Sequence, residues 1–271
     1  MDLNCLFWNV NGMDVHAEIV GIVEEKAINI IALAEYNGDG RQILSELVSQ
    51  GYEFFLIPRI GCDRIVILVR FSGEYINHAR EGDRYTIKEI RIPGMLPILL
   101  CVVHLPSKLH AADDGQAYYA RGLIDVIEAS ERDFKHSNTV VFGDFNMNPF
   151  DAGMMAVDAF NSLSCRKDAG RMQREYYGRS HKFFYNPSWG LLGDMNGSPG
   201  TYYHSSPALL SRYWNMLDQV ILRPEISNRF DVNLFAVLSK VRGRRLVDRN
   251  GRPSVSDHLP IIFSIKINSE V

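Results

Sequence analysis

The fold of this chain is decided by the stretch Thr139-Val140-Val141-Phe142-Gly143-Asp144-Phe145-Asn146-Met147-Asn148-Pro149. Its apolar first part predicts a buried strand, and the glycine, polar residues and proline that follow predict a turn. Ligands of α/β proteins bind just beyond the carboxyl ends of buried strands, so Asp144 and Asn146 would lie where a ligand binds. The same residue types also form ordinary Asx turns, and the stretch alone favours neither interpretation.

The composition is typical of a soluble globular protein. The chain has 271 residues, of which 46% are hydrophobic and 23% charged, enough for one large domain or two small ones. No apolar run approaches the roughly 20 residues that span a bilayer, so we expect no membrane segment. The N-terminus lacks the basic region of a secretory signal. The four cysteines show no paired spacing, which favours free thiols and a cytoplasmic location.

Basic residues gather in two runs, although the net charge of −3 gives no overall signature of nucleic-acid binding. Residues 166–182 and residues 240–252 each hold six arginines and lysines. Such runs are usually solvated surface, but they can also meet a phosphate backbone. In the second case we expect five arginines on one rim of the site: Arg174, Arg179, Arg242, Arg244 and Arg245.

The hydrophobic pattern favours one α/β domain with two packed sheets and helices outside them. Strands are predicted at residues 3–10, 28–34, 52–57, 64–70, 84–92, 97–105, 139–142, 217–222, 231–238 and 259–267. Helices are predicted at residues 15–27, 41–50, 116–134 and 151–163. Residues 164–213 show weak periodicity, and a loop of this length is unusual in a compact domain unless it is functional.

Polar residues stand at one predicted strand end after another. They are Asn9, Asn11, Glu35, His104, Asp144, Asn146, Asp218, Asp257 and His258. Each alone could be a cap, a turn or a satisfied histidine. Together, carboxylate and amide oxygens suit Mg²⁺ or Mn²⁺, and no Cys/His zinc set accompanies them. Such groups could activate water at a phosphodiester, and an aspartate such as Asp218 could fix the tautomer of His258.

The order of these motifs resembles the endonuclease/exonuclease/phosphatase superfamily, the group with the deoxyribonuclease I-like fold. The motifs are Asn9-Val10-Asn11-Gly12, Glu35, His104, Gly143-Asp144-Phe145-Asn146-Met147-Asn148-Pro149, Leu217-Asp218 and Ser256-Asp257-His258-Leu259-Pro260. The resemblance therefore covers the chain from its first strand to its last. It implies a four-layer α/β sandwich in which two packed, mainly antiparallel β-sheets are flanked by helices. This would be a single domain over residues 1–271, with a long irregular insertion at about residues 164–213.

The resemblance also implies a metal-dependent phosphoric ester hydrolase that uses Mg²⁺, with Mn²⁺ as a possible substitute. Glu35 would be the principal metal ligand, and Asn9 and Asp257 would assist it. Asn11 would be a second metal ligand, at a position where several relatives have aspartate.

The resemblance also implies catalytic roles for five further residues. Asp144 would orient or deprotonate the attacking water, and Asn146 would position the water or the phosphate. His258, paired with Asp218, would act at the scissile phosphate. His104 would contact the phosphate or assist the leaving group.

The substrate is narrowed by departures from the family pattern. Abasic-site endonucleases usually carry Gln before the metal glutamate and Thr-Lys after it, whereas this chain has Ala34-Glu35-Tyr36-Asn37. Residues 200–203 and 213–219 resemble a segment that flanks the site in many bacterial members, where aromatic rings could stack on a base. Substrate contacts are therefore expected from Thr201, Tyr202, Trp214 and Asn148, although the rings could equally be packing residues.

We therefore expect a nuclease that acts on DNA or RNA. A phosphatase or phosphodiesterase acting on a small-molecule or lipid phosphoester is the alternative, because it would share the same core residues. A catalytically silent binding module is less favoured, since such a relative would be expected to have lost Glu35, Asp144 or His258.

Overall fold

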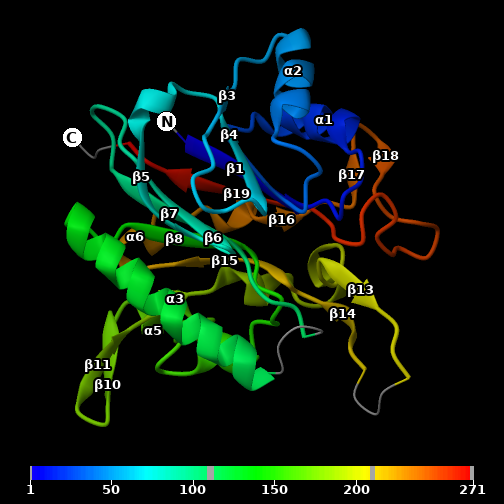
Figure 1. Ribbon diagram of the computed structural model, residues 1–271. Helices are drawn as coiled ribbons and strands as arrows, with labels where there is room; N and C mark the ends of the chain where they lie inside the picture. The colour runs from blue at the N-terminus through cyan, green and yellow to red at the C-terminus, as the bar shows by residue number, and fades with distance from the viewer. Residues whose placement is uncertain (1, 109–112, 208–210, 269–271) are drawn as a thin grey trace.

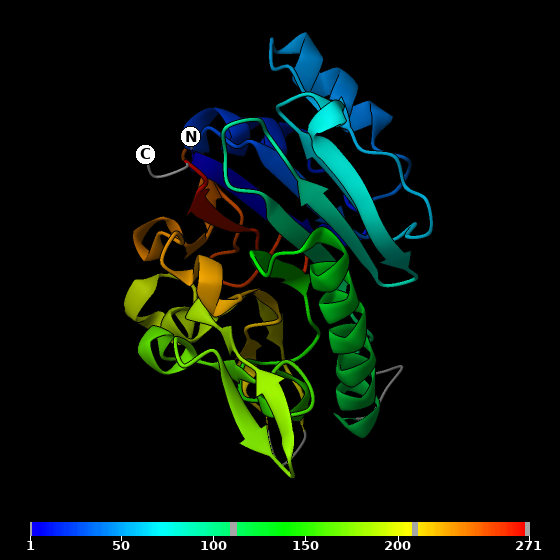
Figure 2. The ribbon, with the colours of Figure 1, turned by 90° about the vertical axis from the view of Figure 1, so that its left-hand side faces the viewer.

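Two β-sheets pack face to face in the computed structural model, which describes residues 2–108, 113–207 and 211–268. Helices α1 (His16–Lys26) and α2 (Arg41–Ser49) cover the outer face of one sheet. The long helix α3 (Asp113–Phe134) covers the outer face of the other (Figures 1 and 2). This arrangement is the four-layer α/β sandwich that the sequence predicted.

The first sheet has six strands and one parallel pair. In spatial order the strands are β16 (Ala236–Val237), β19 (Ile261–Lys266), β1 (Asp2–Asn9), β2 (Ile30–Ala34), β4 (Ile65–Val69) and β3 (Phe55–Leu56). Strands β1 and β2 are parallel and are joined by α1, whereas the other neighbours are antiparallel.

The second sheet has seven strands and repeats this plan at its centre. Its order is β5 (Ile76–Gly82), β6 (Tyr85–Ile90), β7 (Ile98–His104), β8 (Thr139–Asp144), β15 (Asp218–Leu222), β12 (Phe184–Tyr185) and β9 (Ser162–Leu163). Strands β7 and β8 are parallel and are joined by α3. Strands β12 and β9 are also parallel, and the remaining neighbours are antiparallel.

Short elements fill the connections. They are the helices α4 (Ala152–Met155), α5 (Arg166–Ala169) and α6 (Pro224–Ser227), and the 3₁₀ turns η1 (Gly73–Tyr75), η2 (Pro187–Leu191), η3 (Asp194–Asn196) and η4 (Val232–Leu234). Three two-stranded ribbons lie outside the main sheets: β10 (Gln173–Tyr176) with β11 (Arg179–Lys182), β13 (Tyr202–His204) with β14 (Tyr213–Asn215), and β17 (Lys240–Val241) with β18 (Arg244–Arg245).

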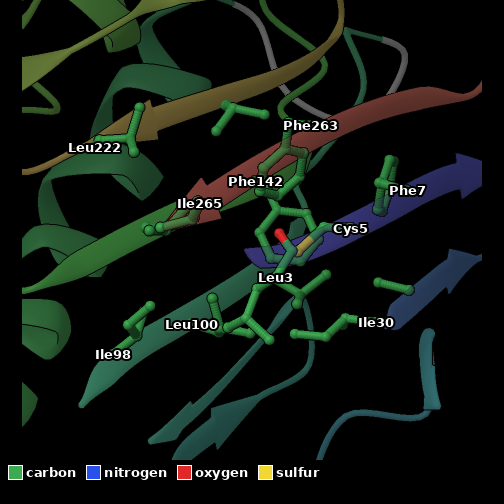
Figure 3. Packing of buried hydrophobic residues seen from close by; sticks show 14 of the residues in the cluster. Leu3, Cys5, Phe7, Ile30, Ile98, Leu100, Phe142, Leu222, Phe263 and Ile265 are labelled. Atoms are coloured by element: carbon green, nitrogen blue, oxygen red, sulfur yellow. The ribbon is translucent and has the colours of Figure 1, made fainter. Parts of the chain in front are cut away.

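Apolar side chains fill the space between the sheets. Successive side chains of a strand point to opposite faces, so alternate residues of β1 and β8 enter this central core. The ring of Phe142 packs edge-on against Phe7 and Phe263, with ring centroids 6.3 and 5.0 Å apart (Figure 3). The intervening residues, among them Leu6 and Val141, pack under the outer helices. Strands β1 and β8 are buried on both faces, which explains their nearly continuous apolar sequence.

Two local predictions were wrong, and one strand was missed. Strand β5 was not predicted, because its sequence Ile76-Asn77-His78-Ala79-Arg80-Glu81-Gly82 is mostly polar. The helix predicted at 151–163 is reduced to α4, since the chain becomes extended at Ala156 and pairs as β9. The strand predicted at 231–238 begins as the turn η4 and pairs only as β16.

Residues 164–213 contain α5, β10 to β14, η2 and η3, and their residues 208–210 lie outside the described part of the chain. Among the described residues, none of the helices combines the length and the apolar character needed to cross a membrane. Cys5, Cys62 and Cys101 are buried free thiols.

Gly143 shows why the signature after β8 begins with glycine. Its φ of 138° is rare for L side chains, and an added Cβ would lie 2.1 Å from the carbonyl oxygen of Val103 in β7. We expect Gly143→Ala to lower the free energy of unfolding by about 3 kcal/mol or more, because backbone must move apart in the middle of a sheet. Chemical denaturation measures this loss.

Gly122→Ala is the matched control for that variant. Gly122 lies within α3 and an added Cβ would meet nothing within 4 Å, so the change should stabilise the protein by up to about 1 kcal/mol. Equal stability of Gly143→Ala and the wild type would contradict this account of the β7–β8 contact.

Candidate active site

Six strand ends meet at one edge of the sandwich. The parallel strands β1, β2, β7 and β8 finish there, and the antiparallel strands β15 and β19 start there. The register of the second sheet pairs Asp144 with His104 on one side and with Asp218 on the other. The sheet topology therefore gathers polar residues that are more than a hundred positions apart in the sequence.

Asp144 is the buried centre of this cluster. Its Oδ2 atom accepts a hydrogen bond of 3.0 Å from the Asn9 amide of the opposite sheet, and its Oδ1 atom accepts the backbone N–H of Asn146 at 2.8 Å. Asn146 has a φ of 52°, a left-handed conformation, and its side-chain amide donates to Asp144 and to the carbonyl of Leu105. The turn after β8 thus folds back onto its own aspartate.

His258 and Asp218 form a buried pair beside Asp144. The Nδ1 atom of His258 lies 2.8 Å from Oδ2 of Asp218. The Oγ1 atom of Thr201 accepts the backbone N–H of Asp218, which fixes the start of β15. The His258 carbonyl accepts the indole N–H of Trp8 at 2.9 Å. The imidazole is therefore held through both its ring and its backbone.

Glu35 and His104 form a second pair at the same edge. The Nε2 atom of His104 lies 3.1 Å from Oε1 of Glu35, and Asn9 donates to the same oxygen at 3.1 Å. The hydrogen bond from His104 is the main reason that the pKa of Glu35 falls to about 2. Glu35 is therefore ionised at neutral pH, and its side chain is 40% exposed, unlike that of Asp144.

Burial and mutual charge set the protonation of the central groups. Burial raises the pKa of Asp144 above its ordinary range. Burial opposes the charge on His258, but the carboxylates of Asp218 and Asp144 outweigh it and raise the histidine pKa to about 10. His258 is thus an imidazolium at neutral pH in the metal-free protein.

Two groups of ligand atoms could hold a divalent cation. Glu35 offers an ionised and partly exposed carboxylate, the hard oxygen donor that Mg²⁺ prefers. Asp144, Asp218 and His258 also offer atoms that all lie within 4.8 Å of one another. However, these three are buried, and the hydrogen bond to Asp218 already occupies Nδ1 of His258. The Glu35 side therefore fits a hydrated Mg²⁺ better.

The other sequence-predicted metal ligands lie at the border of the cluster. Asn9 is buried and bridges Glu35 and Asp144 through its amide nitrogen, while its oxygen accepts the backbone N–H of Asn11. Asn11 is exposed, with a φ of 46°. Asp257 is exposed and accepts a hydrogen bond from Ser256. The structure thus brings Asn9 into the cluster and leaves Asn11 and Asp257 on its outer side.

Tyr202 is the predicted substrate contact that lies nearest the cluster. Its ring centroid is 4.8 Å from that of His258. The ring of His204 is stacked on that of Tyr202, with centroids 6.3 Å apart and an interplanar angle of 10°. Trp214 instead packs against Tyr203 and the core beneath α1. The Tyr202 and His204 rings form a short aromatic shelf that leads away from His258.

The remaining two predicted contacts have internal partners. Thr201 is fully buried and bonds to the backbone of Leu217 and Asp218. Asn148 is buried, and its amide bonds to Asn215 and to the backbone of Met216. Both residues therefore have the geometry of groups that position β14 and β15 rather than groups that face a substrate.

The five arginines expected on one rim do not share it. The ribbon β10–β11, with Arg174 and Arg179, lies at the lower left of Figure 1, whereas β17 and β18 lie at the upper right. Arg242 pairs with Glu24, and Arg244 pairs with Glu18 at 2.7 Å, so both dock the β17–β18 ribbon onto α1. Arg245 is exposed on the same ribbon.

Two positioning residues were missed in the sequence. Ser256 donates from Oγ to the carbonyl of Asn9 at 2.9 Å, and Trp8 holds the His258 backbone. The order Ser-Asp-His was visible in the sequence, but nothing in it indicated that the serine ties the final strand to β1.

The imidazolium of His258 has a consequence for pH that can be measured. We expect Asp218→Asn to lower the pKa of His258 well below 10, because the main opposing charge is lost while burial remains. Nitrogen-15 NMR of the histidine rings in metal-free protein follows both titrations. Because the pKa of His258 is higher in the folded than in the unfolded state, the charged imidazolium stabilises the folded protein. This contribution to stability is complete below the ordinary histidine pKa near 6.5 and is lost as pH rises through about 10. An unchanged titration in Asp218→Asn would contradict the pairing.

Comparisons with known proteins identify the fold. No protein-family model matches the chain, and no curated protein matches it either. TDP2 from D. rerio, complexed with a single-strand DNA product, is 17% identical with a TM-score of 0.57, over 98% of this chain and 99% of that one. An AP endonuclease from Archaeoglobus fulgidus is 14% identical with a TM-score of 0.57, over 97% and 99%.

The 3′ phosphatase NExo from Neisseria, bound to a product DNA hairpin, is 13% identical with a TM-score of 0.55, over 97% of this chain and 99% of that one. The likeness to these structures extends over nearly the whole chain. The chain therefore shares the fold of these proteins, the deoxyribonuclease I-like fold.

Proposed function

We propose that this protein is a divalent-metal-dependent phosphodiesterase that hydrolyses nucleic acid. One observation carries the proposal: Oδ2 of Asp144 lies 3.9 Å from Nε2 of His104 and 4.0 Å from Nε2 of His258. Two imidazoles thus flank one buried carboxylate, and a second carboxylate anchors each of them. Such a cluster of histidines and carboxylates supports a functional role, because buried ionisable groups are costly unless they are paired. Groups of this kind with shifted pKa values gather at functional sites.

Each group suits one part of phosphodiester hydrolysis. Asp144 has a raised pKa, so it can accept a proton from the water whose oxygen forms the new bond to phosphorus. The His258 imidazolium can stabilise the charge on the phosphoryl oxygens and give a proton to the ester oxygen as its bond to phosphorus breaks. Asn146 and His104 would hold the water and the phosphate in place.

Glu35 would hold the cation, with Asn9 bonded to the same carboxylate. A bound divalent ion supplies Lewis-acid polarisation of a phosphate oxygen. Mg²⁺ is the proposed ion, and Mn²⁺ has the same preference for oxygen ligands. Asp257 lies on the exposed side of the cluster and would assist Glu35 in holding the ion.

Nucleic acid is the proposed substrate class for two reasons. The aromatic shelf of Tyr202 and His204 begins at His258, where it could stack on the base next to a scissile phosphate. DNA is also bound in two of the similar structures, those of TDP2 and NExo. The unpaired, buried thiols Cys5, Cys62 and Cys101 support a reducing, cytoplasmic location as part of this proposal.

Cleavage of a substrate panel tests the proposal. It includes single- and double-stranded DNA, RNA, bis-p-nitrophenyl phosphate and phosphomonoesters, each with Mg²⁺, with Mn²⁺ and with EDTA. We expect diester cleavage that EDTA abolishes. Asp144→Asn and His258→Asn should each lower kcat on the order of 10² to 10⁴-fold, because each removes proton transfer or charge stabilisation.

Asp125→Asn is the control for the carboxylate change, since Asp125 is exposed on α3. It should keep full activity. Activity that survives in Asp144→Asn and His258→Asn would overturn the site assignment. Cleavage confined to phosphomonoesters would overturn the diester assignment and favour a phosphatase, and activity on none of the substrates would favour a binding module.

Glu35→Gln tests the metal assignment separately. The amide keeps the shape and removes the negative charge, so the Mg²⁺ concentration for half-maximal activity should rise at least tenfold. Binding of Mn²⁺, followed by electron paramagnetic resonance without substrate, should weaken in parallel. If Asp218→Asn weakened Mn²⁺ binding and Glu35→Gln did not, the ion would belong to the buried Asp144, Asp218 and His258 group instead.

A further inference from the structure

The ribbon β10–β11 divides its residues between two faces. Residues paired directly across an antiparallel ribbon share a face, and here Arg174 pairs with His181 while Tyr176 pairs with Arg179. These four residues therefore lie on one face, which has no acidic group. The other face carries Gln173, Glu175, Ser180 and Lys182. One face thus carries two arginines, a histidine and a tyrosine, and the only acidic residue of the two strands, Glu175, lies on the other face.

The opposite face meets the body of the protein at the base of the ribbon, through Lys182. Lys182 bonds to Glu131 of α3 at 2.9 Å, and the backbone of Phe183 donates to Met172 at the base of the ribbon. Asn161 also donates to the Lys182 carbonyl. The ribbon is therefore anchored at its base, and its contact with α3 is made by Lys182 of the opposite face, while Arg174, Tyr176 and Arg179 are exposed. In the described parts of the chain, no carboxylate forms an ion pair with Arg174 or Arg179.

The turn at the tip has a residue that turn chemistry does not favour. Tyr177 and Gly178 have φ values of 46° and 69°, so both adopt the left-handed conformation of a two-residue hairpin turn. Asn-Gly is the favoured sequence there, and a bulky residue in this conformation is strained. Yet Tyr177 is 88% exposed, and its ring lies 4.6 Å from that of the half-exposed Tyr176. The tyrosine is therefore explained neither by the turn nor by packing.

We propose that the outer face and tip of this ribbon bind a single-stranded segment of the nucleic-acid substrate, away from the hydrolytic site. Arg174 and Arg179 would contact phosphates, and Tyr176 and Tyr177 would stack on unpaired bases. The inference rests on the proposed nucleic-acid substrate. The ribbon lies well separated from β13 and β14, which flank the candidate site (Figure 1). It therefore adds affinity for long strands and leaves the chemical step unaffected.

Binding without cleavage tests this proposal. Fluorescence anisotropy in EDTA measures the affinity of the full chain for an oligothymidylate of about 30 nucleotides, longer than the site size of a single binding module. Tyr177→Asn should weaken binding about tenfold, the loss expected for one stacked base. The same variant should keep or raise the melting temperature, because asparagine suits the turn. A folding defect therefore cannot account for the loss.

Arg174→Gln and Arg179→Gln test the electrostatic part. Each should lower the slope of log affinity against log salt by about 0.7, the value for one phosphate contact on a single strand. Gln173→Ala and Ser180→Ala on the opposite face are the matched controls and should leave affinity unchanged. All these variants should hydrolyse bis-p-nitrophenyl phosphate at the wild-type rate.

Three results would overturn the proposal: equal affinity in wild type, Tyr177→Asn and the arginine variants; tighter binding of duplex than of the single strand; or a dimer that Tyr177→Asn dissociates, since the ribbon would then serve self-association. Failure of the proposed hydrolysis is a separate outcome. In that case no diester is cleaved with Mg²⁺, yet binding in EDTA still depends on the ribbon.

Discussion

A hydrogen bond between Asn9 and Asp144 joins the two sheets at the place where the chemistry is proposed, beside the Glu35–His104 and Asp218–His258 pairs that also span them. Asn9 ends β1 in the first sheet, and its amide donates to Asp144, which ends β8 in the second sheet. Each sheet has a central parallel pair bridged by a helix, and both pairs point their carboxyl ends to this edge. The bond forms only if the sheets pack in one register. The packing of Phe142 between Phe7 and Phe263 therefore matters for the site as well as for stability.

The same geometry explains the electrostatics of the site. Asp144 is buried between two histidines, and each histidine is held by its own carboxylate, Glu35 or Asp218. Because Glu35 is partly exposed and ionised while Asp144 is buried with a raised pKa, the two carboxylates suit different tasks. One can hold a cation and the other can accept a proton. The two carboxylates are thus suited to different roles by how deeply each is buried, rather than by residue type.

Much of this arrangement could be predicted from the sequence, and the reasons are particular. Strand β8 was recognised because its apolar run, which reflects burial on both faces, is followed by Gly143, whose φ of 138° allows the close approach to Val103. Asp144 and Glu35 were found because they follow such strands. The partnership of Asp218 with His258 spans 40 positions, and it was suggested by the chemistry of the two residue types and by the resemblance to a known superfamily. Its geometry depends on the register of β15 against β8, which no local pattern encodes.

Short elements were the hardest to predict. Periodicity needs several residues to appear, and the strands β10 to β14, which begin between residues 164 and 213, have only two to four residues each. The mostly polar strand β5 gave no apolar signal at all. The basic runs were misplaced for a related reason, because composition does not reveal that Arg242 and Arg244 pair with acidic residues of α1.

Diffraction from crystals grown with Mn²⁺ and a phosphorothioate dinucleotide tests the central claim most directly. The account predicts Mn²⁺ on the Glu35 carboxylate and the phosphorothioate between His104 and His258; a phosphorothioate bound elsewhere, or Mn²⁺ inserted between Asp218 and His258, would contradict it.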